Sequence, residues 1–236
     1  MKKNFRFLLF LSFILNIAAC KEKPSNEKVD STDNKSTVEV GAQPSDEKVK
    51  GGNAAEPVTR IVMDTSMGII ELDLNAEKAP LSVANFLRYV DSKQFDDTVF
   101  HRVIQDFMIQ GGGFAASGEE KETLASIKNE SANGLSNARG TIAMARTNHP
   151  DSATAQFFIN VGDNTSLDGA NGRPGYAVFG KVVSGMDVVD AIRAVKTGQK
   201  TMKAIHPDGR LYPQPFQDVP MKDVVIKSIK ISSAGS

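Results

Sequence analysis

The sequence predicts a mainly β protein whose antiparallel strands close, or nearly close, into one domain. Three observations favour this fold class: many short runs with alternating or β-branched residues, only two stretches with helical spacing, and glycine-rich turns between them. Closure is expected because it removes the exposed strand edges of an open sheet. The folded part, residues 58–236, is long enough for a single hydrophobic core.

The beginning of the chain has the order of a secretory signal peptide, which we place at residues 1–19. A basic start is followed by an apolar run and then by small residues: Lys2, Lys3 and Arg6, then Phe7 to Leu15, then Ala18-Ala19. The apolar run is too short to span a bilayer comfortably, so we expect this segment to be removed.

Cys20 is the only cysteine in the sequence, so no intrachain disulfide can form. Its place directly after small residues resembles the lipobox of bacterial lipoproteins, which implies that Cys20 is lipidated and anchors the protein to a membrane. The alternative is an ordinary cleavage site with an incidental cysteine. The resemblance implies the periplasmic side of a bacterial envelope. Lys21 favours the outer membrane, since aspartate there would be an inner-membrane retention signal.

Residues 20–57 comprise this cysteine and a segment that we expect to be a disordered tether. The segment is rich in charged residues, serine and glycine, and it contains no aromatic residue. Such a chain cannot bury enough apolar surface to offset the loss of conformational entropy on folding.

Ordered structure is expected from residue 58 onward. Two β-rich runs, residues 60–65 and 69–74, flank the turn at residues 66–68 and predict a hairpin. Pro80 begins a helical stretch in which apolar residues recur every three or four positions: Val83, Phe86, Leu87 and Val90. This apolar stripe should cover one end of a sheet.

Residues 99–104 and 107–114 predict two central strands around a polar break at Gln105-Asp106. One face of this pair combines a forked cation, large apolar groups and an amide: Arg102, Phe107, Met108 and Gln110. From composition alone, the simplest interpretation is a core hairpin with the arginine in a surface ion pair.

The rest of the chain alternates between apolar runs and polar stretches. Residues 115–140 and 196–220 lack a sustained period and are expected to be loops. Residues 186–195 have helical spacing, and strands are expected at residues 141–145, 156–161, 176–183 and 223–231.

Five segments, in the same order, resemble the cyclophilin family of peptidyl-prolyl isomerases. They are Phe100 to Gly112, Met144-Ala145, Gln156 to Ile159, Leu167-Asp168 and Val178 to Val182. The resemblance covers residues 58–232. It implies a closed eight-stranded antiparallel β-barrel capped by two α-helices. It also implies isomerisation of X–Pro bonds, which would assist the folding of exported proteins.

The resemblance assigns roles residue by residue. Arg102 corresponds to the catalytic arginine. The proline pocket is implied to be lined by Phe107, Met108, Phe158 and Leu167, and the substrate backbone is implied to lie beside Gln110, Ala145 and Gln156. Tyr176 stands where many eukaryotic members have histidine, and its phenol can pack against the substrate ring and offer one hydrogen bond. Ser166 stands where they have tryptophan, which argues against tight cyclosporin binding.

The expected partners are proline-containing polypeptides, and the expected state is a monomer without metal or organic cofactor. The formal net charge is zero, which argues against nucleic acid as a partner. The three histidines are too far apart to match a metal-binding motif. The alternative function is a module that binds proline peptides, or acts like a chaperone, without appreciable turnover.

Two further features have structural interpretations. His101 neighbours Arg102 on a strand and should point to the opposite face, which predicts a hydrogen-bonded structural histidine. Residues 111–113 are three glycines that no Gly-Lys-Ser/Thr follows, so a close backbone approach or a bulge is expected rather than a phosphate cradle.

Overall fold

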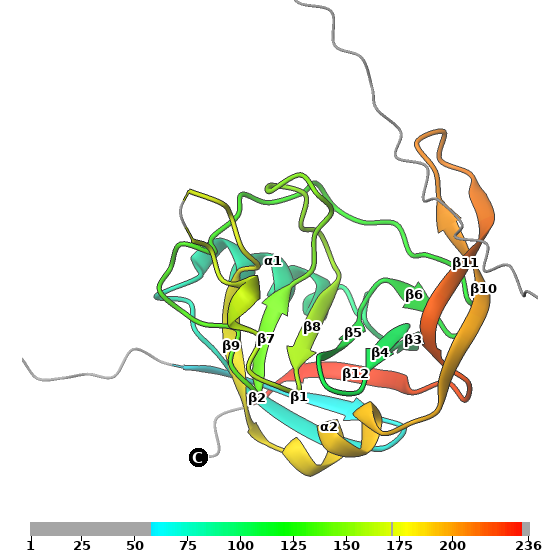
Figure 1. Ribbon diagram of the computed structural model, residues 1–236, viewed down its shortest axis with the longest axis horizontal. Helices are drawn as coiled ribbons and strands as arrows, with labels where there is room; N and C mark the ends of the chain where they lie inside the picture. Colours follow the sequence, from blue (N-terminus) through cyan, green and yellow to red (C-terminus); the bar gives the residue numbers. More distant parts are fainter. Residues whose placement is uncertain (1–57, 171, 233–236) are drawn as a thin grey trace, which may run out of the picture. The chain divides into compact units, whose positions relative to one another are not determined.

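The computed structural model describes residues 58–170 and 172–232 (Figure 1). The expected signal peptide, the expected lipidation site at Cys20 and the expected tether all lie outside these residues. Within the described part of the chain, no helix is long and apolar enough to cross a membrane.

One antiparallel sheet forms most of the fold, with its strands in the order β4-β5-β8-β7-β9-β2-β1-β12-β3-β6. Its first strands in the chain are β1 (Thr59–Thr65), β2 (Gly68–Leu74), β3 (Thr98–Val99), β4 (Arg102–Ile104), β5 (Met108–Gly111) and β6 (Phe114–Ala115). The later ones are β7 (Thr141–Met144), β8 (Phe157–Asn160), β9 (Val178–Ser184) and β12 (Val225–Ile231). The helices are α1 (Pro80–Asp91) and α2 (Met186–Arg193), with a short 3₁₀ helix at Thr165–Leu167.

The mainly β class with two helices is confirmed, but the closed eight-stranded barrel is wrong. The sheet has ten strands and curls strongly, and its edge strands β4 and β6 do not pair with each other (Figure 1). The expectation that residues 99–104 form a central strand is also wrong, because β4 is an edge strand.

The expected loop at residues 196–220 is instead a second, two-stranded sheet, formed by β10 (Thr197–Ile205) and β11 (Leu211–Pro220). Its three prolines lie in β11, an edge strand, where a missing N–H need not remove a ladder hydrogen bond. This hairpin lies across the gap that separates the two edges of the large sheet. β11 runs beside β4, while Lys203 of β10 bridges to Glu119, which follows β6.

Local sequence signals explain the elements that were predicted. Thr65 closes the β1–β2 turn, because its hydroxyl donates to the Gly68 carbonyl at 2.7 Å. Helix α1 begins at Pro80, where the missing N–H has no cost. The carboxylate of Glu130, from the long excursion at residues 115–140, accepts hydrogen bonds from the next backbone N–H groups, those of Leu81 and Ser82, at 2.9 and 2.8 Å. This distant carboxylate therefore satisfies the positive end of the helix.

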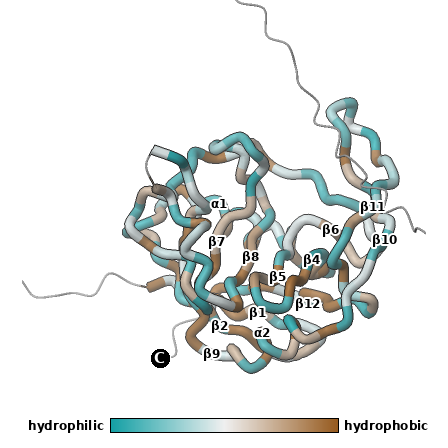
Figure 2. The backbone as a smooth tube through the Cα atoms, in the orientation of Figure 1, coloured by the Kyte–Doolittle hydropathy of each residue, from teal (hydrophilic) through white to brown (hydrophobic). Residues whose placement is uncertain are grey.

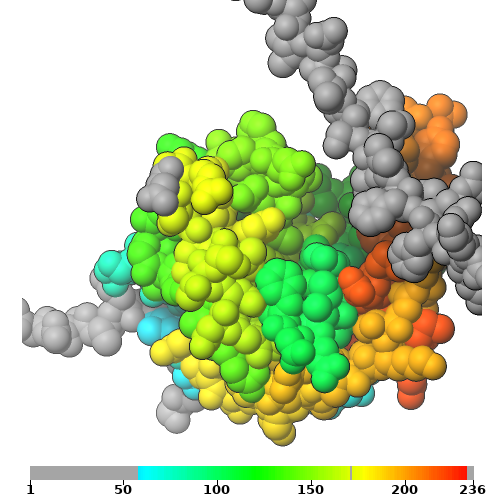
Figure 3. Space-filling view, in the orientation of Figure 1, coloured from blue at the N-terminus to red at the C-terminus, as the bar shows by residue number. Residues whose placement is uncertain are grey.

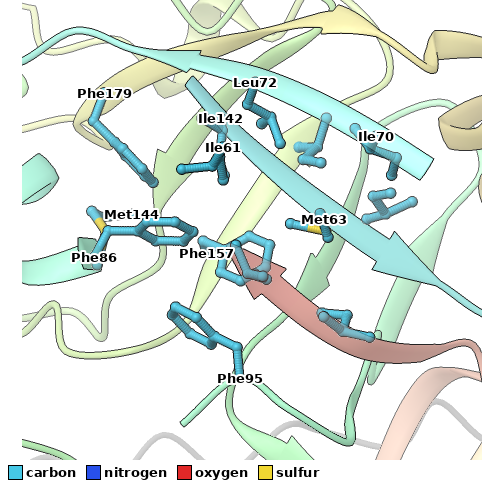
Figure 4. Close-up of a cluster of buried hydrophobic side chains, with 14 of the residues drawn as sticks. Ile61, Met63, Ile70, Leu72, Phe86, Phe95, Ile142, Met144, Phe157 and Phe179 are labelled. Atoms are coloured by element: carbon cyan, nitrogen blue, oxygen red, sulfur yellow. The ribbon is translucent and has the colours of Figure 1, made fainter. Parts of the chain in front are cut away.

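The core lies inside the curl of the sheet, where buried hydrophobic side chains gather (Figure 4). Much of the backbone of the central strands is coloured as hydrophobic (Figure 2). Phe157 of β8 is at the centre of this core. Its ring meets Phe86, Phe95 and Phe100 edge-on, with ring centroids 5.6, 5.5 and 6.5 Å apart. Edge-on contacts suit the aromatic quadrupole, and the tight packing fixes β8 against α1. The next residue, Phe158, faces away from this core into a separate apolar cluster.

Candidate active site

Three neighbouring strands bring key side chains of the site onto one face. Arg102 of β4 lies opposite Gln110 of β5, and Gln110 lies opposite Phe158 of β8. Residues directly opposite each other on antiparallel strands project to the same side of the sheet. A cation, an amide and an aromatic ring are therefore placed in one row by strand register alone.

A cavity of about 380 Å³ opens over this row. Every pocket and backbone-contact residue expected from the sequence lines it: Arg102, Phe107, Met108, Gln110, Ala145, Gln156, Phe158, Leu167 and Tyr176. A recess is visible between the green residues of β4 and β5 and the orange-red residues of β11 (Figure 3).

The apolar part of the cavity is a preformed wall. Met108 and Phe158 are buried, and Phe107, Leu167 and Tyr176 pack against them while staying partly exposed. The rings of Phe158 and Tyr176 meet edge-on, with centroids 5.7 Å apart. Such a wall can bury a small apolar ring at little cost in rearrangement.

The polar part of the cavity is held by two glutamines. The Gln110 side-chain amide donates to the Gln156 side-chain carbonyl at 2.8 Å, and the Gln156 backbone carbonyl accepts from the Ala145 N–H at 2.9 Å. A Cβ at Gly113 would approach the Gln156 side chain to 2.7 Å, and Gly112 has a φ of +84°. The expected close backbone approach at the three glycines is thus confirmed.

Arg102 is exposed at the edge of this wall. Within residues 58–170 and 172–232, no ion pair or side-chain hydrogen bond occupies its guanidinium. The surface ion pair suggested by composition alone is therefore absent from the part of the chain that the structure describes. The donors of Arg102 face a concave apolar surface, where a bound ligand could accept from them.

Residues 60–231 match the family model described as "Cyclophilin type peptidyl-prolyl cis-trans isomerase/CLD". The chain belongs to this family. The peptidyl-prolyl cis-trans isomerase cyp18 of Streptomyces antibioticus is 52% identical over 177 residues, which cover 74% of this chain and 99% of that protein. The peptidyl-prolyl cis-trans isomerase B of Escherichia coli (strain K12) is 47% identical over 175 residues, which cover 73% of this chain and 99% of that protein.

A solved structure shares the cyclophilin fold. The crystal structure of a Cryptosporidium parvum cyclophilin type peptidyl-prolyl cis-trans isomerase superposes with a TM-score of 0.59 at 22% sequence identity. The match covers 75% of this chain and 99% of that chain. At this identity the likeness shows the fold alone.

In this cyclophilin, Arg146 contacts the ring of Tyr176 and the loop that precedes it. The Arg146 guanidinium carbon lies 4.5 Å from the centre of the Tyr176 ring, a cation–π contact. Its Nε and Nη2 donate to the backbone carbonyls of Gly175 and Pro174 at 3.0 and 2.8 Å. Arg146 thereby fixes both the ring and the loop that leads to it.

A row of hydrogen-bonded polar side chains, of which Asn137 and Asn160 are buried and Asn164 and Asp168 are half-buried, supports the pocket. Asn160 donates to the side chain of Asn137 at 3.2 Å and accepts from Asn164 at 2.7 Å. Asn164 also donates to the Phe107 carbonyl at 2.7 Å, and Asn137 donates through its side chain to Asp168 at 2.8 Å. The row therefore connects the turn that carries Phe107 with the segment that follows Leu167.

Asp168 anchors one end of this row. Burial opposes ionisation of its carboxyl, but hydrogen bonds from Ser136 and Asn137 outweigh that effect and keep the Asp168 pKa below its usual value. Asn137 also donates to the Tyr176 carbonyl at 3.2 Å. A fixed carboxylate thus helps to hold the backbone at Tyr176.

Replacing Asn160 by alanine should lower the free energy of unfolding by about 2 kcal/mol, because buried hydrogen-bonding groups of its neighbours would lose partners. Asn160 is fully buried. Urea unfolding of the two proteins measures the difference. Alanine at Asn148, an exposed position, is the control and should change little. A change below about 0.5 kcal/mol for Asn160→Ala would show that the row is not a structural support.

His101 is buried, with 3% of its surface exposed, and its ring packs against Phe114 at a centroid distance of 4.9 Å. Its burial and this contact fit a structural role for the ring. The expected hydrogen bond is not seen at Nδ1, which has no partner within the described residues. Burial lowers the His101 pKa to about 4, and contacts with the Val99 backbone and the Gln156 side chain oppose this shift only in part. His101 is thus neutral at physiological pH.

Sequence reasoning missed six residues that line the cavity: His101, Phe114, Glu120, Arg146, Ala204 and Phe216. Ala204 and Phe216 belong to the β10–β11 hairpin, where the prolines suggested a loop. One signal could have found them. Tyr212, Gln214 and Phe216 alternate with Leu211, Pro213 and Pro215, which is the period of a strand.

Proposed function

We propose that the cavity beside Arg102 is where this peptidyl-prolyl cis-trans isomerase rotates X–Pro bonds. The family match and the names of its relatives support the activity. The observation that supports the location is the row of Arg102, Gln110 and Phe158 on one face of three paired strands. The partners are proline-containing polypeptides.

The chemistry needs no nucleophile. The barrier to peptide-bond rotation is about 20 kcal/mol, because the C–N bond has partial double-bond character. A catalyst must therefore bind the twisted amide better than either planar form. In the twisted amide the proline nitrogen has lost conjugation and carries a lone pair, which can accept a hydrogen bond from the Arg102 guanidinium.

The remaining residues hold one part of the substrate while the other part rotates. The proline ring is proposed to sit against Phe107, Met108, Phe158 and Leu167, where burial of its methylene groups binds it. Gln110, Ala145 and Gln156 are proposed to hold the substrate backbone beside it. Tyr176 closes the pocket with its ring and can offer one hydrogen bond.

We further propose that the protein works at the periplasmic side of a bacterial envelope on exported clients. The support is the order of residues 1–19 and the single cysteine at position 20. A Cys20→Ala variant should lose membrane association, and this is measured by fractionation of cells that express the full chain. Unchanged fractionation of the variant would contradict a lipid anchor at Cys20.

The test of function is isomerisation of a short X–Pro peptide by the purified full chain. Uncatalysed exchange takes tens of seconds at 25 °C, so acceleration is easily followed. We expect exchange to speed up in proportion to protein concentration. Peptide binding without acceleration would instead indicate a proline-recognition module that does not turn over.

A further inference from the structure

We infer that the β10–β11 hairpin builds a second substrate subsite, which selects an apolar side chain near the isomerised proline. This inference rests on the proposed function, because it takes the Arg102 cavity as the place where the substrate binds. It adds a selectivity that the proline pocket itself does not provide.

The cavity does not end at Arg102. Phe114, Glu120, Ala204 and Phe216 also line it, and β11, which carries Phe216, runs beside the edge strand β4, on the side away from β5 and β8. These residues come from β6, the segment that follows it, and both strands of the hairpin. Because one continuous cavity joins the two parts, a polypeptide bound at the first can extend into the second.

The floor of this second part is aromatic. Phe114 is buried, and Phe216 is partly exposed and packs edge-on against it, with ring centroids 5.1 Å apart. Phe216 also packs against an apolar cluster that contains Met202 and Val219 of the hairpin. The exposed part of the Phe216 ring can therefore be covered by a ligand without rearrangement of its support.

The hairpin is docked firmly enough to act as a wall. The backbone of Lys203 donates to the Gly118 carbonyl and accepts from the Glu120 N–H, each at 2.8 Å. One carboxylate oxygen of Glu120 accepts from the Ile205 N–H at 2.8 Å. These bonds preorganise the subsite, so little conformational entropy is lost when it is filled.

The composition of the subsite sets what it accepts. Two aromatic rings and Ala204 favour a bulky apolar side chain. The Glu120 carboxylate at the rim disfavours an acidic side chain, since like charges repel. The subsite should therefore rank phenylalanine or leucine above glycine, and glycine above aspartate.

The spacing of strands predicts where that side chain lies along the substrate. The proline is proposed to lie between Phe158 on β8 and Arg102 on β4, that is, over β5, and β11 lies two strand positions farther on, beyond β4, on the order of 10 Å away. An extended chain advances about 3.3–3.6 Å per residue. The selected side chain should therefore be about three residues from the proline.

The test is a peptide scan with the full chain. Peptides with one proline in a glycine background carry a single phenylalanine at one to five residues on either side, and kcat/KM for isomerisation is measured for each. One position about three residues from the proline should exceed the all-glycine peptide by about tenfold. Aspartate at that position should fall below glycine.

Two variants test whether this peptide preference comes from the proposed subsite. Phe216→Ala should bring the phenylalanine-to-glycine ratio close to one, whereas Leu211→Ala should preserve it. Leu211 is an apolar residue of the same strand, 40% exposed and on the opposite face. Glu120→Gln retains an acceptor for the Ile205 N–H and should remove the discrimination against aspartate, which gives a second readout if Phe216→Ala does not fold.

The outcomes separate this inference from the proposed function. If the wild type accelerates no peptide, the proposed function fails, and the subsite fails with it. If it accelerates all peptides equally, isomerisation stands and the subsite is overturned. A phenylalanine preference that survives in folded Phe216→Ala, or an aspartate penalty that survives in Glu120→Gln, would overturn it as well.

Discussion

Arg102→Ala is expected to lower kcat/KM for X–Pro isomerisation by about 10²- to 10³-fold, the usual cost of removing one preorganised donor to a transition state. The loss should appear mainly in kcat. The hydrogen bond to the proline nitrogen forms only when the amide twists, so ground-state binding depends on it little. Because Arg102 is exposed, the variant should remain folded.

Two further variants make this result specific. Arg102→Lys keeps the charge but loses the planar fork of donors, and it should recover only part of the activity. Arg88→Ala removes an exposed arginine of helix α1 and should leave kcat/KM unchanged. If folded Arg102→Ala stayed within about twofold of the wild type, Arg102 would not act at the transition state, since a twofold change is well below the usual cost of losing such a donor.

Resemblance to the cyclophilin family predicted the members of the pocket, and strand register explains why several of them meet on one face. The segment from Phe100 to Phe114 alternates over two strands, so its polar and apolar faces can be assigned before any partner is known. β8 then pairs with β5 so that Phe158 lies beside Gln110. A short motif with a fixed period thus determines most of the row that lines the cavity.

Features that depend on distant contacts could not be predicted in the same way. The three prolines of β11 are compatible with a strand only because it is an edge strand, and that is a property of the fold rather than of the segment. Whether the sheet closes into a barrel is likewise a property of the whole fold. A local pattern does not reveal that β10 and β11 occupy the gap between β4 and β6, or how many strands the sheet contains.

The row of polar side chains around Asn160 also depends on contacts between distant segments, so it could not be predicted from the sequence. Asn137, Asn160 and Asn164 lie in polar or strand segments that give no sign of mutual contact, yet their side chains join across the fold. Asparagine is common in turns, so its presence in a loop carries little information. Only the tertiary arrangement shows that these residues support Phe107 and Tyr176.

Stability should fall with acidification between about pH 6.5 and pH 4 because of His101. Its pKa is about 4 in the folded protein and about 6.5 when unfolded, so in this window the unfolded chain binds a proton that the folded chain does not. The stabilising difference is fully present above pH 6.5 and is lost as the pH falls toward 4. A shift of this size corresponds to about 3 kcal/mol in the free energy of unfolding.

Urea unfolding at half-unit pH steps measures how the free energy of unfolding changes with pH. The range from pH 6.5 to pH 4 separates the effect of His101 from that of the paired aspartates. Arg60 and Arg139 hold the pKa values of Asp73 and Asp190 below their usual value, so the stability from those carboxylates is lost at lower pH. His101→Gln should flatten the curve between pH 6.5 and 4, whereas His149→Gln, at an exposed position, should not. A slope that persists in His101→Gln would mean that another group binds the proton, and that the buried imidazole is not what makes this cyclophilin sensitive to acid.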